Sequence, residues 1–332
     1  MIRWGIVGPG DIADRVMAPA MLAAPNAQLV AVAGRDRARS EAFAARHGEA
    51  RTYENAEAVA RDPDVDAVYV ATPVDRHRAD VEAVAAAGKD VLVEKPIGLN
   101  QADAQAMVDA CTAAGVRLGT CFYQRYNTRH RLVRELLAAN RIGQVATVAL
   151  TFSGRSPGKD GAWRQDPARS GGGSFIDSAS HCVDLLRFLF GEVQQLVAFT
   201  ATLAEKYAVE DTAFAILRLE SGVHAVITAH WSVHDPSDQR SSVLQIGGTE
   251  GTIVTWPLHD KFSRGRLVTA IGDDEDEIEV RTQSTHVALL EDFAAARAAG
   301  NPFPITGEDG LAAQRIVDAV YESSRGGQLV RL

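Results

Sequence analysis

The spacing of apolar residues changes once along the chain. Over the first 120 residues, short apolar runs alternate with amphipathic stretches. The runs predict buried strands and the stretches predict helices that cover them. Strict alternation of this kind is typical of a parallel sheet with helices on both faces. The predicted strands are 2–7, 29–33, 67–72, 90–94 and 117–120, and the predicted helices are 14–24, 37–46, 56–61, 77–87 and 101–114.

After residue 125, strand-like segments follow one another directly, which predicts a largely antiparallel sheet. We therefore expect an α/β protein with a doubly wound parallel-sheet domain at 1–122 and an α+β domain with a large, mostly antiparallel open sheet at 123–332. The last helix is expected to be able to pack back on the first domain. The predicted strands of this half are 145–153, 196–203, 212–219, 224–232, 241–247, 252–256, 266–270 and 277–280, and its helices are 130–139, 175–190, 285–299 and 307–324.

The first predicted strand leads directly into a glycine turn. Gly8-Pro9-Gly10, followed by Ala13, matches G-x-G-x-x-G/A at the start of a helix. The first glycine permits a tight turn, the second lets the backbone approach a pyrophosphate, and the helix offers its amides and positive dipole end. Asp11 and Ile12 lie in the same turn. The alternative is an ordinary glycine turn of an α/β fold.

The end of the second strand bears on the choice of nucleotide. An NAD-binding fold usually places an acid there, against the adenosine ribose. This chain has Gly34 at that point and Arg35 next, and a guanidinium can hold a 2′-phosphate. The sequence therefore favours NADP over NAD, although Asp36 keeps NAD open because a small error of register would place it on the ribose.

Two further strand ends carry polar side chains. Thr72-Pro73 with His77 follows the 67–72 strand, and Glu94-Lys95-Pro96 follows the next. Ligands of open parallel sheets bind outside the carboxyl ends of the strands. An ammonium at that edge can polarise a substrate oxygen or relay its proton. A surface lysine that happens to end a strand is the alternative.

A triple glycine, residues 171–173, opens the helix predicted at 175–190. Asp177, His181 and Asp184 then follow at a spacing that places them on one helix face. Oxidation of an alcohol by hydride loss needs a base for the hydroxyl proton, and histidine with a carboxylate serves near neutral pH. A solvated polar stripe is the plain alternative. A metal site is disfavoured because it would need more ligands than this spacing offers, so we predict none.

Composition narrows the class of protein. The chain has 332 residues, of which 46% are hydrophobic and 23% are charged, with a net charge of −9. An acidic surface argues against nucleic acid as a partner. No apolar run is long enough to span a bilayer, and the first strand leaves no room for a leader, so we expect a cytoplasmic protein. The acidic run 273–277 predicts a solvated turn, and the three cysteines are expected to be free, buried thiols.

Taken in order, these motifs resemble the Gfo/Idh/MocA family of nicotinamide-dependent oxidoreductases. The resemblance covers nearly the whole chain, although no single motif decides it. Besides the turns above, it includes Arg125-Tyr126-Asn127, Trp163-Arg164 and the closing stretch 304–310. It implies a Rossmann dinucleotide-binding domain at 1–122 and a substrate-binding and oligomerisation domain at 123–332. It also implies hydride transfer between NAD(P) and a carbinol of a sugar, inositol or related polyol. Within it, the histidine at 181 points to the inositol and sugar dehydrogenase branch, since some relatives have tyrosine there.

The resemblance also implies roles for single residues. Lys95 is the catalytic lysine, His181 the base, and Asp177 binds or orients substrate. Two alternatives stay open: a non-catalytic sensor of the same fold, and an enzyme for a diol, an imine or a tetrapyrrole. We also expect a homodimer or homotetramer, because outward Phe214, Ile216 and Val226 leave the second sheet an apolar outer face. The expected cofactor contacts are Gly8, Gly10, Asp11, Ile12, Gly34, Arg35, Thr72, Pro73, His77, Glu94, Lys95 and Pro96, and the expected substrate contacts are Tyr123, Arg125, Trp163, Arg164, Asp177 and His181.

Overall fold

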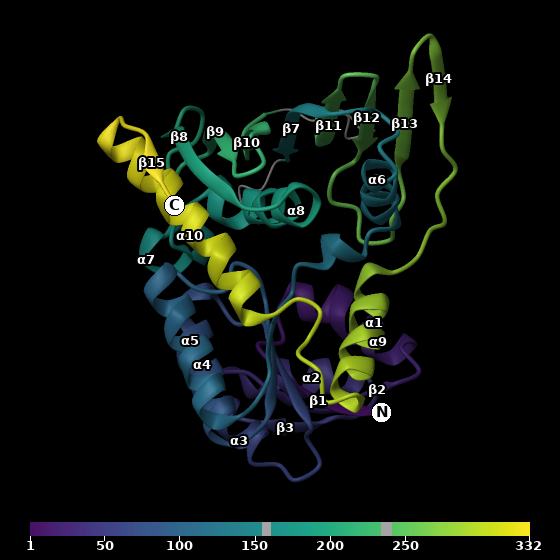
Figure 1. Cartoon of the computed structure of the whole chain (residues 1–332). Coiled ribbons are helices and arrows are strands. Elements are labelled where there is room, and N and C mark those ends of the chain that lie inside the picture. Colours follow the sequence, from purple (N-terminus) through teal and green to yellow (C-terminus); the bar gives the residue numbers. More distant parts are fainter. Residues whose placement is uncertain (155–160, 234–240) are drawn as a thin grey trace. The chain divides into compact units, whose positions relative to one another are not determined.

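A computed structural model describes residues 1–154, 161–233 and 241–332 of the chain (Figure 1). The chain divides into two compact units. The first comprises residues 1–122 and 286–314, and the second comprises 123–285 and 315–332. The expected second domain, 123–332, thus differs from the observed unit at residues 286–314, which are counted with the first.

The first unit is built on a six-stranded sheet in the order β3-β2-β1-β4-β5-β6, in which all strand pairs are parallel. The predicted doubly wound sheet is therefore confirmed. Short β3 was not predicted, since three half-exposed residues leave no apolar run. The strands are β1 (Ile2–Val7), β2 (Ala27–Ala33), β3 (Arg51–Tyr53), β4 (Ala67–Val70), β5 (Asp90–Val93) and β6 (Leu118–Thr120).

Helices follow the strands of this unit as the sequence predicts. Asn100 begins α5 by accepting a hydrogen bond from the amide of Asp103 at 3.0 Å, and Asp36 begins α2 in the same way. The first helix starts with a π-helical turn, η1, which the sequence did not reveal. The helices are η1 (Ala13–Met17), α1 (Ala18–Ala23), α2 (Arg37–Arg46), α3 (Ala56–Ala60), α4 (Val74–Ala86), α5 (Gln101–Ala114) and α9 (Thr285–Ala298).

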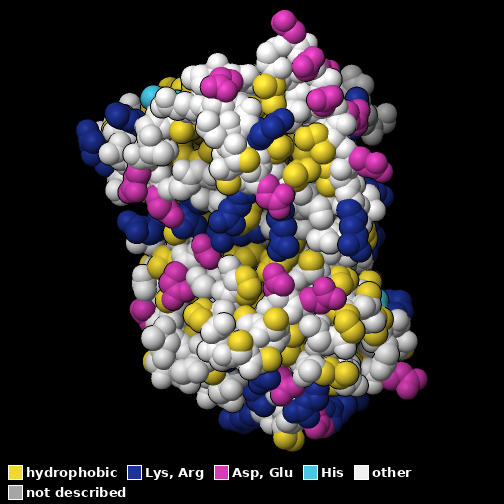
Figure 2. Space-filling model, turned by 45° about the vertical axis from the view of Figure 1, so that its right-hand side comes forward, with side chains coloured by type: hydrophobic (Ala, Val, Ile, Leu, Met, Phe, Trp, Pro, Cys, Tyr) yellow, Lys and Arg dark blue, Asp and Glu magenta, His cyan; other side chains and the backbone are white. Residues whose placement is uncertain are grey.

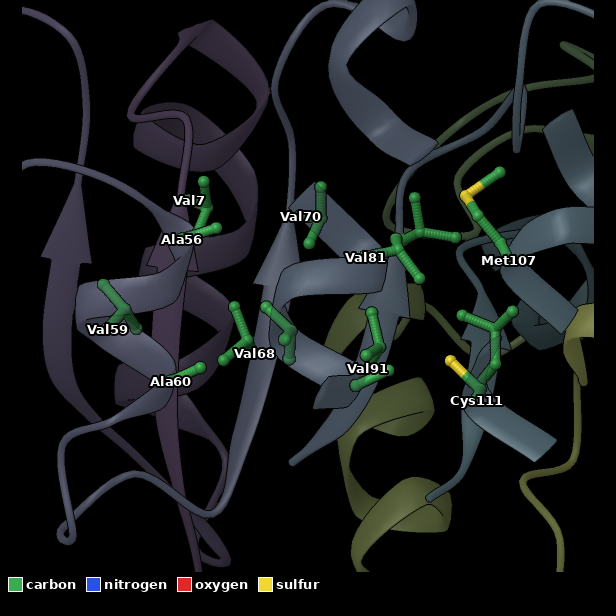
Figure 3. Close-up of a cluster of buried hydrophobic side chains, with 14 of the residues drawn as sticks. Val7, Ala56, Val59, Ala60, Val68, Val70, Val81, Val91, Met107 and Cys111 are labelled. Carbon is green, nitrogen blue, oxygen red and sulfur yellow. The ribbon is translucent and has the colours of Figure 1, made fainter. Parts of the chain in front are cut away.

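The two faces of the first sheet bury different side chains. On one face, valines of the strands pack with α3, α4 and α5 in a single cluster that includes Val68, Val91 and Met107 (Figure 3). On the other, Trp4 meets Phe293 of α9 with ring centroids 5.4 Å apart. Both faces of the sheet are covered by apolar side chains. The carboxyl ends of the strands are therefore where this unit can present polar groups.

The second unit contains a nine-stranded sheet in the order β14-β13-β12-β11-β7-β10-β9-β8-β15. Only β7 and β10 pair in parallel, so the predicted, mostly antiparallel sheet is confirmed. The strands are β7 (Val145–Ser153), β8 (Val193–Ala201), β9 (Thr212–Leu219), β10 (His224–His230), β11 (Val243–Gly248), β12 (Gly251–Trp256), β13 (Arg266–Ile271), β14 (Asp274–Glu277) and β15 (Val330–Arg331).

The acidic run corrects one sequence prediction. Residues 274–277 form the edge strand β14 rather than a turn, and no strand covers 278–280. All four side chains are exposed, and Figure 2 shows acidic groups gathered at the top of the molecule, over the β13–β14 hairpin. Charge is tolerated there because an edge strand pairs on one side only, and it discourages pairing with another chain.

One face of the second sheet packs against the long helix formed by η4 (Phe175–Ala179) and α8 (Ser180–Phe190), which lies beside β7 and β10 (Figure 1). Along β9, Ala213, Ala215 and Leu217 are buried, whereas Phe214 and Ile216 are 45% and 54% exposed. The buried face therefore positions the helix. The remaining helices of this unit are η2 (Tyr123–Tyr126), α6 (Thr128–Ala138), η3 (Trp163–Gln165), α7 (Pro167–Ser170) and α10 (Gly307–Gly326), of which α10 begins in the first unit.

Three further features concern the cysteines, membrane-spanning helices and metal sites. All three cysteines are free and buried. No described helix is long and apolar enough to cross a membrane. Within the same residues, no three His, Cys, Asp or Glu side chains gather in a way that could hold a metal ion.

Candidate functional site

The turn after β1 has the geometry that a dinucleotide requires. Gly8 has φ +92°, and a Cβ there would lie 2.7 Å from the backbone of Ala71 and Thr72, so only glycine fits. A Cβ on Gly10 would meet nothing within 4 Å. The space beside Gly10 and the helix that starts at Asp11 suit a pyrophosphate held by backbone amides.

The end of β2 explains why no acid stands at position 34. A Cβ on Gly34 would lie 2.8 Å from the Pro9 ring and 2.8 Å from the Ser40 hydroxyl. The Asp36 carboxylate accepts the amide of Arg39 at 3.0 Å and so caps α2. Arg35 is exposed, and no described residue forms a hydrogen bond or ion pair with its side chain. Asp36 and Arg35 are the two candidates for contact with the adenosine ribose. Of these, Asp36 caps a helix, whereas the exposed Arg35 side chain can turn toward a ligand.

The His77 side chain lies in the interior of the first unit and not at its surface. Its ring is 1% exposed and lies between two strand-end loops, with Nε2 2.9 Å from the Thr72 carbonyl oxygen and Nδ1 3.1 Å from that of Pro96. Burial lowers its pKa. The Thr72 hydroxyl in turn donates to Asp80 at 2.8 Å. His77 therefore ties the Thr72-Pro73 turn to the turn after Lys95, and its expected cofactor contact stays a prediction.

The Glu94 carboxylate also forms hydrogen bonds within the first unit. Its carboxylate is buried, accepts the Tyr69 hydroxyl at 2.5 Å, and accepts the amide of Lys95 at 3.1 Å. Tyr69 is fully buried, and burial raises its pKa well above the ordinary value. The neighbouring Lys95 is half-buried, and Pro96 is buried. Glu94 and Pro96 thus shape the turn that presents Lys95, and their expected cofactor contacts stay predictions.

In the second unit, one helix carries Asp177 and His181. Asp177 lies on the π-helical turn and is partly exposed, while His181 is 4% exposed at the start of α8. The Tyr123 ring meets His181 edge-on with centroids 4.8 Å apart, and Phe152 of β7 lies parallel to it at 6.5 Å. The imidazole thus has an apolar surround and a carboxylate on the same helix.

The Trp163-Arg164 pair lies beside Asp177. Arg164 Nε is 3.5 Å from the Asp177 carboxylate, and its guanidinium lies over the Trp163 ring at 4.4 Å from the centroid. Both side chains are only half-buried. The structure therefore brings Arg164, Trp163 and Asp177 together, which is compatible with the predicted substrate contacts.

Arg125 is engaged elsewhere. Its guanidinium makes a bidentate ion pair with Asp184, with a shortest separation of 2.6 Å, and Asp184 is fully buried. Arg125 also lies over the Phe188 ring at 5.6 Å. This pair anchors η2 to α8, and substrate contact by Arg125 stays a prediction. Asp184 therefore does not join Asp177 and His181 in a polar stripe.

Family models match most of the chain. Residues 2–122 match the model described as an oxidoreductase family with an NAD-binding Rossmann fold, and residues 130–254 match the GFO/IDH/MocA C-terminal domain. The chain belongs to the Gfo/Idh/MocA family. The predicted family is therefore confirmed, and with it an oxidoreductase with an NAD(P)-binding fold.

Characterised members of the Gfo/Idh/MocA family align end to end with this chain. It is 29% identical to 1,5-anhydro-D-fructose reductase of Ensifer adhaerens, with 100% of this chain and 99% of the relative covered. Identity to inositol 2-dehydrogenase of Rhizobium meliloti (strain 1021) is 31%, with 97% and 96% covered. The crystal structure of aldose-aldose oxidoreductase from Caulobacter crescentus, complexed with glycerol, superimposes with a TM-score of 0.91 at 26% identity, with 100% and 99% covered.

Sequence reasoning missed the residues that hold this family's motifs in place. Tyr69 lies inside a strand and was read only as apolar. Glu210 bonds to Gly173 of the triple glycine from 37 positions away, and Tyr321 bonds to Ile176 from 145 positions away. No local spacing links such residues, because sequence patterns reveal contacts within one element and not between distant ones.

The contrast between Gly10 and Gly34 gives a first prediction. Gly10→Ala adds a Cβ in open space, so the free energy of unfolding should stay unchanged while nucleotide affinity falls. Gly34→Ala pushes a Cβ against Pro9 and Ser40 and should destabilise the fold by about 1–3 kcal/mol. Urea unfolding and nucleotide titration by fluorescence separate the two. Equal loss of stability in both variants would contradict the assignment of the open space to a ligand.

Proposed function

We propose that this protein transfers a hydride between a nicotinamide nucleotide and a carbinol carbon of a sugar, inositol or related polyol. The observation that carries the proposal is the partly exposed Asp177 on the same helix as a histidine enclosed by Tyr123 and Phe152, in a chain with a nucleotide-binding turn. The names of the relatives, a sugar reductase and an inositol dehydrogenase, support the substrate class.

His181, Lys95 and Asp177 have different roles toward the substrate. The turn at Gly8 and Gly10 would hold a nicotinamide nucleotide, which would supply hydride chemistry when bound. His181 takes the hydroxyl proton as the carbon is oxidised, and returns it in the reverse direction. Lys95 donates a hydrogen bond to the same oxygen and stabilises its developing negative charge. Asp177, held by Arg164, orients His181 or a neighbouring substrate hydroxyl. Tyr123 and Trp163 offer aromatic surfaces to a sugar ring.

We further propose that NADP is preferred to NAD. Gly34 leaves no room for an acid, Asp36 caps its own helix, and Arg35 is exposed at the strand end. A guanidinium there can make charge-assisted hydrogen bonds to a 2′-phosphate. The cytoplasmic location and the absence of a nucleic-acid partner stay predictions.

The open face of the second sheet supports self-association. Phe214, Ile216 and Val226 are exposed on it, and a groove of about 480 Å³ is lined by Ile216, Val226 and Val254 among others. An apolar face of this kind is usually covered in a soluble protein. We propose that a second copy of the chain covers it in a homodimer or homotetramer.

His181→Ala should lower turnover by about 10²–10⁴-fold, because general-base catalysis contributes that much, while nucleotide affinity stays nearly intact. Lys95→Ala should behave alike. The double variant should lose far less than the product of the two losses, since groups that act as a unit are not additive. Steady-state kinetics of the three variants on one polyol provide the measurement. Near-normal turnover in either single variant would refute these roles.

Arg35→Ala should weaken NADP binding by roughly 1.5–3 kcal/mol, the contribution of a charge-assisted hydrogen bond, and leave NAD binding unchanged. Arg37→Ala is the matched control, since Arg37 is also exposed and pairs with Glu41 instead. Fluorescence titration with both nucleotides decides the matter. Tighter binding of NAD by the wild type, or unchanged NADP affinity in Arg35→Ala, would contradict the preference.

Light scattering at working concentrations should give a multiple of the monomer mass for the wild type. Ile216→Asp should reduce that mass, because a charge on the open face opposes its burial. Leu22→Asp, at a residue 57% exposed in the first unit, should not change it. A monomeric wild type would contradict the proposed association.

A further inference from the structure

We propose that Glu210 and Tyr321 are positioning residues that fix the start of the helix carrying Asp177 and His181. Neither was predicted from the sequence, and neither is assigned to a substrate or to the nucleotide above. The expected effect on turnover rests on the proposed polyol function, whereas the hydrogen bonds that hold the helix start do not. The contacts themselves lie wholly within the second unit.

Glu210 precedes β9 and faces the first amides of the helix. Its carboxylate accepts the amide of Gly173 at 2.7 Å through Oε2 and that of Phe175 at 2.8 Å through Oε1. Its main-chain carbonyl oxygen accepts the amide of Ser174 at 2.9 Å. Three successive amides therefore end on one residue.

Tyr321 of α10 completes the set. Its hydroxyl accepts the amide of Ile176 at 3.2 Å and donates to the Glu210 carboxylate at 2.8 Å. A helix leaves its first four amides without partners inside the helix. Here the four amides of residues 173–176 are satisfied by two residues from distant segments, Glu210 through its carboxylate and its main-chain carbonyl and Tyr321 through its hydroxyl.

The charge of Glu210 suits this place. The residue is 8% exposed, and no cation pairs with its carboxylate among the described residues. Burial raises its pKa, while the hydrogen bonds from Phe175, Tyr321 and Gly173 lower it. The positive end of the helix dipole favours a carboxylate at this point. The helix start is thus the principal partner of a buried carboxylate.

The triple glycine follows from this packing. A Cβ on Gly173 would lie 1.9 Å from the Glu210 carbonyl oxygen, and a Cβ on Gly172 would lie 2.2 Å from the Tyr321 hydroxyl. Gly172 and Gly173 thus admit the Tyr321 side chain and the Glu210 backbone, which hold the start of the helix in one position.

The held turn is π-helical, with Asp177 on it and His181 just after it. A π turn contains one more residue than an α turn. If the turn relaxed to α-helical hydrogen bonding, Asp177 would rotate about the helix axis relative to His181. The hydrogen bonds of Glu210 and Tyr321 oppose that rotation and so keep the two side chains in their relative orientation.

The test compares Glu210→Gln with Asp211→Asn. Asp211 is the next residue, and its carboxylate also accepts backbone amides, those of Leu203, Ala204 and Glu205, which lie away from the helix. Tyr321→Phe serves as a second variant that keeps the ring. The polyol turned over fastest by the wild type is used, with its reacting carbon protonated or deuterated.

Glu210→Gln should lower kcat by roughly 10–100-fold, the scale of a small misplacement of catalytic groups, while nucleotide affinity stays unchanged. The deuterium isotope effect on kcat should rise, because the hydride step slows. Tyr321→Phe should also lower kcat and raise the isotope effect, but by smaller amounts than Glu210→Gln. A merely structural role would reduce only the active fraction and leave the isotope effect as in the wild type.

Amide hydrogen exchange gives a readout that needs no substrate. Exchange of residues 171–182 should accelerate in Glu210→Gln and not in Asp211→Asn, in which residues 201–207 should accelerate instead. Kinetics in Glu210→Gln within twofold of Asp211→Asn, an unchanged isotope effect, or equal exchange of 171–182 in both variants would overturn the inference. Absence of turnover by the wild type would contradict the polyol function alone, and exchange would then decide the holding role.

Discussion

Two buried carboxylates, one in each unit, support the backbone that presents the proposed catalytic groups. Glu94 accepts the Tyr69 hydroxyl and the amide of Lys95, and Glu210 accepts the Tyr321 hydroxyl and the amides of Gly173 and Phe175. Burying a carboxylate is costly unless hydrogen bonds satisfy it. Each carboxylate is therefore stable only while the loop or helix start that it holds keeps its conformation, and this mutual dependence makes both segments rigid.

The same logic explains why the polar motifs of this chain contain so many residues that need not touch a ligand. His77 joins two strand-end loops, Thr72 bonds to Asp80, and Gly34 makes room for Pro9. A site that must hold two reactants in one geometry gains more from rigid support than from further contacts. In this protein, several motif residues support the backbone of those that are proposed to meet substrate or nucleotide.

The sequence predicted elements better than contacts. Spacing alone predicts the strand 145–153, which matches β7 residue for residue, and the cap at Asn100, because both depend on neighbours within one element. It missed the strand character of 274–277, where the exposed edge of a sheet overrides the low strand propensity of acids. It did not reveal the partners of Glu94, His77 and Arg125 within the fold, since residue type reveals chemistry but not the direction in which a side chain points. Glu210 and Tyr321 left no local pattern at all.

The central claim is that this member of the Gfo/Idh/MocA family oxidises or reduces a polyol through its nicotinamide nucleotide. The most direct measurement is a panel of aldoses, inositols and their keto forms, assayed with NAD and NADP by the absorbance of the reduced nicotinamide. The account predicts turnover of at least one member, with the matching nucleotide reduced or oxidised in equal amount. Protein that binds nucleotide but converts no member of the panel would contradict it.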